Sequence, residues 1–182
     1  MTKKLPVNLE MTISQAIEDV ISTHHRYLQD ELPKLQDLLD EVVLTYSLDD
    51  ENLKIYSQMF EVYRETLCEH AIKEEKDLFP LCIELEENGT IPSVCRGSLV
   101  DPMDVMEGEH EAFDLLYQKM QEYLERFSTE VKEDEVLGEF IKRFALLQED
   151  MLIHKMKEEN IIFPKVTILE SALASPAVFP AY

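Results

Sequence analysis

The stretch that decides the fold is HAIKEEKDLFP, residues 70–80, which returns later in the chain as HKMKEENIIFP, residues 154–164. Aligned without gaps, the two stretches are identical at six of eleven positions. Each opens with a histidine that is followed four residues later by a glutamate, and residues four apart in a helix project from the same face. We therefore expect both stretches to be helical, and each to point a His–Glu pair at one centre.

An upstream histidine accompanies each copy of this motif. His25 lies 45 residues before His70, and His110 lies 44 residues before His154. Each half of the chain is thus predicted to be a helical hairpin that carries a histidine on its first arm and the His–Glu motif on its second arm. The two halves form a pseudo-repeat.

Helical periodicity predicts four long amphipathic segments, from about residue 13 to 44, 50 to 88, 101 to 127 and 134 to 163. Thr12 and Gln15 are spaced as a capping box at the first start. Pro33 is expected to interrupt and kink the first segment, and Pro80 to break or bend the second. Residue 89 is a plausible stop for the second segment because it is the glycine of an Asn-Gly pair.

The third segment is predicted to open with Asp101 as cap and Pro102 as first helical residue. Residues 128–133 are predicted to be a polar connection. No segment shows strand alternation, and only four glycines are present. The predicted fold is all-α, an antiparallel up-down four-helix bundle. It is divided into an N-terminal arm (1–12), the bundle (13–165) and a C-terminal tail (166–182).

Composition narrows the classes of partner. Seventeen basic against 38 acidic residues give a formal charge of −21, which argues against nucleic acid and anionic membranes as partners. No apolar run is long enough for a membrane span, and no signal peptide opens the chain. The three cysteines form no CxxC pair, which suits the cytoplasm. The oligomeric state, monomer or homodimer, stays open.

The spacing of the motifs places four histidines at one depth of the bundle, together with two glutamates. With a rise of about 1.5 Å per residue, the two arms of the first hairpin match to within about 2 Å. We therefore predict a metal centre whose ligands are His25, His70, Glu74, His110, His154 and Glu158. Two iron ions would offer about twelve coordination positions. Four imidazoles, two bridging carboxylates and an oxo or hydroxo bridge would leave about two of them for an external ligand.

This pattern resembles the hemerythrin-like HHE cation-binding family, and more narrowly the bundle domain of the repair-of-iron-centres proteins. The resemblance rests on His25 followed by ELPKL at 31–35, on the first motif, on MEGEH ending at His110, and on the second motif. It covers about residues 15–165. It implies a non-haem di-iron centre and a role in nitrosative or oxidative stress. Full-length members carry an N-terminal Cys–Cys domain that this sequence does not contain, so the resemblance does not extend to the steps those thiols perform.

Several neighbours of the predicted ligands have predicted roles of their own. Glu75 and Glu159 lie about 100° further round the helix than the ligand glutamates and are expected to be exposed. His24 is expected to be a surface residue or an outer support of the centre. Asp114, four residues after His110, would orient that imidazole, bind metal weakly or lie on the surface.

Aromatic, methionine and cysteine side chains near the motifs are read first as core. Tyr63, Phe113 and Met151 lie on the same stripes as the ligands, and packing is the default for them; the alternative is a hydrophobic gate in which Tyr63 donates a hydrogen bond to a bound diatomic molecule or peroxide. Cys68 is expected to be a packed thiol facing away from the metal.

Three functions are compatible with this ligand set. The leading one is a di-iron stress protein. Its iron would act as a sensor, bind a ligand, or be supplied to damaged iron–sulfur centres. The second is reversible binding or sensing of dioxygen or nitric oxide. The third is an enzyme that reduces nitric oxide or peroxide, although the sequence shows no flavin or rubredoxin-like motif. Without metal, the two glutamates are expected to repel each other or to take up protons.

Overall fold

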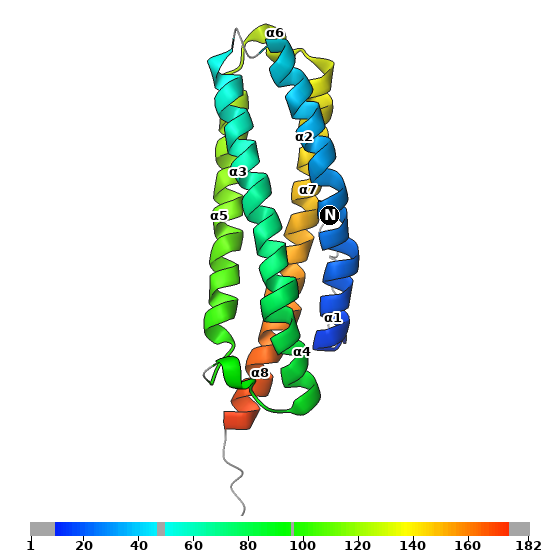
Figure 1. Ribbon diagram of the computed structural model, residues 1–182, viewed down its shortest axis with the longest axis vertical. Coiled ribbons are helices and arrows are strands. Elements are labelled where there is room, and N and C mark those ends of the chain that lie inside the picture. Colours follow the sequence, from blue (N-terminus) through cyan, green and yellow to red (C-terminus); the bar gives the residue numbers. More distant parts are fainter. Residues whose placement is uncertain (1–9, 47–49, 96, 175–182) are drawn as a thin grey trace, which may run out of the picture.

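The computed structural model describes residues 10–46, 50–95 and 97–174. Four antiparallel arms make a bundle in which the chain runs up, down, up and down (Figure 1). The predicted all-α up-down bundle is confirmed, and the described residues contain no strand. Residues 1–9 of the predicted arm and 175–182 of the predicted tail lie outside the described part.

The first two arms are long helices with a wider, π-type turn inserted. The first consists of α1 (Ile13–Asp19), the π segment η1 (Val20–His25) and α2 (Arg26–Tyr46). The second consists of α3 (Glu51–Lys73), the π segment η2 (Glu74–Leu78) and α4 (Phe79–Asn88).

The last two arms complete the bundle. After the short 3-10 turn η3 (Ser93–Cys95), the third arm is the uninterrupted helix α5 (Val100–Leu124). One helical turn, α6 (Thr129–Lys132), leads to the fourth arm, which is α7 (Glu135–Lys157), the π segment η4 (Glu158–Ile162) and α8 (Phe163–Ala174). Helix α2 packs on α3 and α7, and α3 packs on α5.

Several sequence-based boundaries hold because they depend on local chemistry. The Thr12 hydroxyl accepts from the Gln15 backbone N–H, and the Gln15 side chain accepts from the Thr12 N–H, so the predicted capping box is present. The second arm ends at Gly89, whose φ of 60° is the left-handed conformation that favours glycine. The second arm begins after Asp50, whose carboxylate caps α3.

Other boundaries were predicted wrongly. Helix α2 continues past Pro33, and the irregular turn of the first arm lies earlier, at η1. A proline removes a single helical hydrogen bond, and burial of its neighbours Leu32 and Leu35 holds the helix together. Residues 128–133 form the predicted connection, which contains the single turn α6, whereas the fourth arm continues past the predicted end at residue 163 to the end of α8.

The start of α5 also differs from the prediction. Its cap is Leu99, and Asp101 and Pro102 already lie in the first turn. The Leu99 backbone N–H donates to the Glu170 carboxylate at 2.5 Å, and the Val100 N–H donates to the Ser98 hydroxyl at 3.0 Å. The partner that sets this boundary therefore comes from α8, far away in sequence.

Two apolar clusters fill the bundle and leave a polar layer between them. The larger cluster includes Leu28, Leu67 and Phe144, and the smaller one includes Val20 and Ile161. The predicted ligands lie between these clusters along each arm, as Val20, His25 and Leu28 show on the first.

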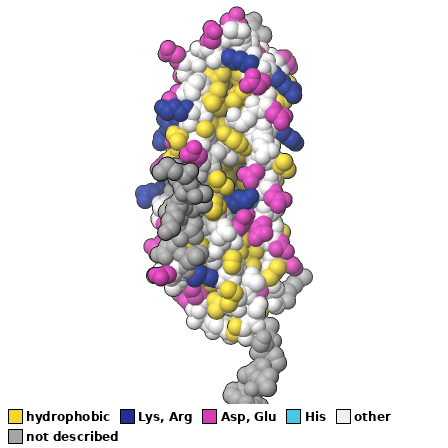
Figure 2. All heavy atoms as spheres, turned by 180° about the vertical axis from the view of Figure 1, so that it is seen from behind, with side chains coloured by type: hydrophobic (Ala, Val, Ile, Leu, Met, Phe, Trp, Pro, Cys, Tyr) yellow, Lys and Arg dark blue, Asp and Glu magenta, His cyan; other side chains and the backbone are white. Residues whose placement is uncertain are grey.

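All five histidines are buried, and none is visible on the face drawn in Figure 2. On that face a strip of hydrophobic side chains runs along the bundle, with acidic side chains on both sides of it. Among the described residues, no helix is both long and apolar enough to span a bilayer.

Candidate metal centre

The π segments and the helix turns beside them position the predicted ligands. His25 closes η1, whereas Glu74 and Glu158 open η2 and η4. His70 and His154 lie one turn before these glutamates, on α3 and α7, and α5 supplies His110. π-type turns inside helices are rare and occur often at functional sites. Three of the four arms have one at this level.

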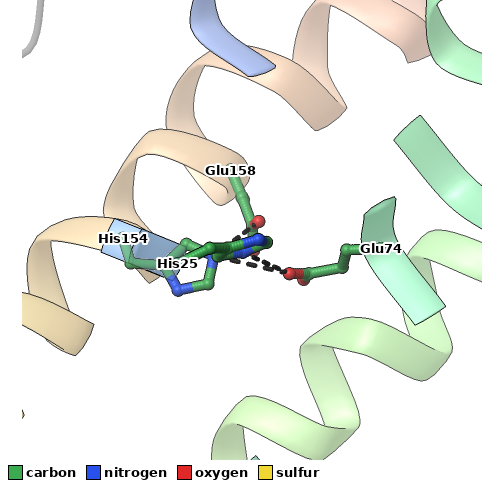
Figure 3. A group of neighbouring side chains, drawn as sticks. All are labelled: His25, Glu74, His154 and Glu158. Carbon is green, nitrogen blue, oxygen red and sulfur yellow. Dashed lines mark hydrogen bonds and ion pairs between the residues drawn. The ribbon is translucent and has the colours of Figure 1, made fainter. Parts of the chain in front are cut away.

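The structure brings all six predicted residues together in two groups. One group is His25, Glu74, His154 and Glu158 (Figure 3), and the other is His70, Glu74, His110 and Glu158. Within each group the ligand atoms lie within 4.8 Å of one another. Both glutamates belong to both groups, which is the arrangement expected of carboxylates that bridge two ions.

The two oxygens of each carboxylate face different histidines. Glu74 directs Oε2 at His25 Nε2 (3.1 Å) and Oε1 at His70 Nε2 (2.8 Å). Glu158 directs Oε1 at His154 Nε2 (2.8 Å) and Oε2 at His110 Nε2 (3.1 Å). Every imidazole therefore presents its Nε2 atom to the centre.

The donor set fits a cation. Glu74 Oε1 and Glu158 Oε2 are buried and accept no well-aligned hydrogen bond among the described residues, although His70 Nε2 and His110 Nε2 lie 2.8 and 3.1 Å from them. His70 Nε2 and His110 Nε2 face each other at 3.0 Å, which requires a proton or a cation between their lone pairs. A buried polar atom without a partner costs free energy, and a bound cation would supply partners for these atoms.

Without metal, protons on imidazole balance the carboxylates. Burial opposes charge on Glu74, but hydrogen bonds from His154, His25 and His70 outweigh it and hold the pKa of Glu74 well below its usual range. Burial likewise opposes charge on His154, but the carboxylates of Glu158 and Glu74 outweigh it and raise the His154 pKa to about 10. The pKa of His70 is also raised, against its burial, mainly by Glu74. The expectation that the glutamates take up protons is therefore wrong for Glu74.

Three of the four candidate ligand imidazoles are held from behind by a carboxylate. The Nδ1 atom of His25 donates to Glu75 at 2.8 Å, that of His70 to Glu109 at 2.8 Å and that of His110 to Glu159 at 3.3 Å. Such a bond fixes the tautomer and the ring orientation of a metal-binding histidine.

Two of these supports were misjudged and one was missed. Glu75 and Glu159 were expected to be exposed, but their side chains are only 33 % and 29 % exposed and turn inward to histidines of other arms. The reason is that both follow a ligand glutamate inside a π turn, where the angle per residue differs from the 100° used for the prediction. Glu109 is part of the MEGEH motif, but the sequence predicted no role for it.

We predict that Glu75→Ala and Glu159→Ala each weaken metal binding about ten- to a hundredfold, because each releases a ligand imidazole. Competition with a chromophoric chelator would measure this under anaerobic conditions. Glu111→Ala, an exposed neighbour of His110, is the matched control and should leave binding unchanged. Unchanged affinity in both variants would show that these carboxylates do not support the ligands.

Other candidates near the centre have different positions. His24 is buried, and its Nδ1 atom donates to the Asp150 carboxylate at 2.9 Å. Asp114 does not contact His110; it is 52 % exposed and pairs with Lys155 at 2.9 Å. The alternative that Asp114 orients His110 is therefore wrong. The alternative that Asp114 lies on the helix surface agrees with the structure.

The hydrophobic neighbours are packed in the larger cluster. Tyr63 is buried there, and its hydroxyl accepts a hydrogen bond from the Gln148 amide. Phe113 lies between Tyr63 and the centre, with its ring centroid 5.1 Å from that of His70. Met151 and Cys68 are partly buried against the same cluster, and Cys68 is a free thiol.

Comparison with known proteins agrees with this geometry. The model of a family described as hemerythrin HHE cation binding domain matches residues 16–166, which is most of the chain. No curated protein matched the sequence.

Proposed function

The chain belongs to the hemerythrin HHE cation-binding family, and on that basis we propose that its six clustered residues hold two non-haem iron ions. The observation that carries this proposal is that Glu74 and Glu158 each belong to both ligand groups. A single ion would use one group and leave the buried oxygens of the other without a partner. Two ions make use of every donor.

The chemistry of the donors favours iron. Imidazole suits iron, copper and zinc, whereas magnesium and calcium prefer all-oxygen surroundings. Two ions that share carboxylates favour iron among these, with manganese and zinc as the main competitors. When bound, such a pair supplies open coordination positions and one-electron redox chemistry. The protein's own residues orient the imidazoles and keep the carboxylates buried, out of contact with bulk water.

We propose that the protein serves in the repair of iron–sulfur clusters or in the response to nitrosative or oxidative stress. The proposal is supported by the resemblance of its motifs to the repair-of-iron-centres proteins. Cys68, Cys82 and Cys95 are free thiols, which is in keeping with a cytoplasmic location. An iron–sulfur protein is the expected macromolecular partner, and a diatomic molecule or peroxide is the expected small ligand.

Reversible binding of dioxygen or nitric oxide is a second candidate, and a specific observation favours it. A cavity of about 230 Å³ lies between α3 and α5, and its apolar lining includes Val62, Leu116 and Phe113. Phe113 contacts His70 on the other side. A small uncharged molecule would find apolar side chains in this cavity, whose lining also includes the charged residues Glu69, Lys73 and Glu109.

We predict about two irons per chain after anaerobic loading with ferrous iron, measured by metal analysis.

The loaded protein is then mixed with an apo iron–sulfur protein, and in parallel with dioxygen, nitric oxide and peroxide. Restored cluster absorbance supports repair, whereas reversible spectral change without iron transfer supports the second candidate. Multiple turnover with an added reductant would instead indicate a reductase.

Glu158→Ala carried through the same procedure controls for adventitious iron. A stoichiometry of one or less at saturation would contradict the paired centre.

A further inference from the structure

The two halves of the bundle surround the centre with nearly equivalent residues. His25 corresponds to His110, and the two His–Glu motifs correspond to each other. The carboxylate that follows each ligand glutamate supports the first-arm histidine of its own half: Glu75 holds His25, and Glu159 holds His110. The pseudo-repeat therefore extends from the ligands to their supports.

The equivalence fails at one position. In the second half the residue before the first-arm histidine is Glu109, and its carboxylate accepts from His70 Nδ1 at 2.8 Å. In the first half the residue before the first-arm histidine is His24. By this correspondence His24 should support His154, and it does lie against that residue, with nearly parallel rings 5.8 Å apart.

No bond like that of Glu109 is made there. His154 is fully buried, and its Nδ1 atom has no hydrogen-bond partner among the described residues. The Nε2 atom of His24 is buried and without a partner in the same way. Asp150, one helical turn before His154, is bonded to His24 Nδ1. An imidazole ring thus stands where the other half has a carboxylate.

The consequence concerns how tightly each ion is held. A carboxylate that accepts from Nδ1 increases the basicity of Nε2 and fixes the ring, and loss of such a partner costs about ten- to a hundredfold in metal affinity. The group of His70 and His110 has both imidazoles supported in this way. In the group of His25 and His154, only His25 is supported.

We infer that the two metal positions are unequal, and that the ion between His25 and His154 is bound more weakly and leaves first. This inference rests on the proposed di-iron centre and deepens it. A protein that supplies iron would then have one ion per chain to give, while the ion between His70 and His110 stays and keeps the site assembled. The feature that makes the position between His25 and His154 labile is the presence of His24 where the second half has the carboxylate of Glu109.

The test is an anaerobic titration of the full chain with ferrous iron against a chromophoric chelator. Two binding steps that differ about ten- to a hundredfold are expected for the unmodified protein. Two ions bound with equal affinity would overturn the inference and leave the di-iron proposal intact. Fewer than two bound ions would overturn both.

Reciprocal substitutions assign the steps to positions. Glu109→His places the first-half residue in the second half and should weaken the tight step about ten- to a hundredfold, so that the two steps merge. His24→Glu supplies the missing carboxylate and should tighten the weak step by a similar factor. It is combined with Asp150→Asn, because two neighbouring carboxylates would repel each other.

Asp150→Asn alone is the control and should leave the separation of the steps close to that of the unmodified protein. If Glu109→His weakened the weaker step and spared the tight one, the assignment would be wrong. Circular dichroism of each variant confirms that it is folded, and the titration of the unmodified protein remains decisive if one variant is not.

Discussion

Replacing Glu74 or Glu158 with alanine is expected to remove more than half of the iron that the protein binds. Each carboxylate takes part in both ligand groups, so its loss deprives both ions of a ligand at once. Metal analysis after anaerobic loading and desalting would measure the loss.

The effect should be specific to a bridging position. Removal of a histidine, as in His25→Ala, takes a ligand from one group and should spare the ion of the other. Glu111→Ala, next to His110 but exposed, should retain the iron of the unmodified protein. If Glu74→Ala lost only as much iron as His25→Ala, then Glu74 would serve a single ion and would not bridge.

Removal of the metal is expected to leave the bundle helical but less stable. The two apolar clusters above and below the polar layer are extensive and independent of the metal. A ligand at a hundred times its Kd adds about 2.7 kcal/mol to the free energy of unfolding. For a domain of this size that corresponds to about 5 to 10 °C in Tm. Chelation followed by thermal melting, monitored by circular dichroism, would measure the difference.

The stability of the metal-free protein should also depend on pH in a defined direction. The pKa of His154 is raised from 6.5 to about 10, so its contribution is complete below about 6.5 and is lost as the pH rises towards 10. The pKa of Glu74 is lowered from 4.5, so its contribution is present above that value and is lost in acid. The Tm of the metal-free protein should therefore fall from about pH 6.5 upward.

Metal reverses this trend because it takes the place of the protons, so the gain in Tm on loading should grow with pH. A coil-like spectrum for the metal-free protein at room temperature would contradict the first expectation and would mean that metal builds the fold. A metal-free Tm that rises with pH above neutrality would contradict the second. It would show that the imidazoles are neutral in the metal-free centre.

The sequence by itself determined the helical class, the four arms and the six candidate ligands. These depend on periodicity and on fixed spacings, such as the four residues between His70 and Glu74, that any helix converts into a shared face. The ends marked by Thr12 and Gly89 were equally predictable, because each residue acts on its own turn, whereas the cap predicted at Asp101 was wrong.

Only the tertiary structure decided what surrounds the ligands. The π turns bring Glu75 to His25 from another arm, which regular helical geometry could not foresee. Glu170 sets the start of α5 from a distant helix. The unsupported Nδ1 atom of His154 became visible only when the arms were packed together. Spacing along one helix fixes which side chains share a face. Contacts between side chains on different arms depend instead on how the helices pack and on the level of the bundle at which each π turn lies.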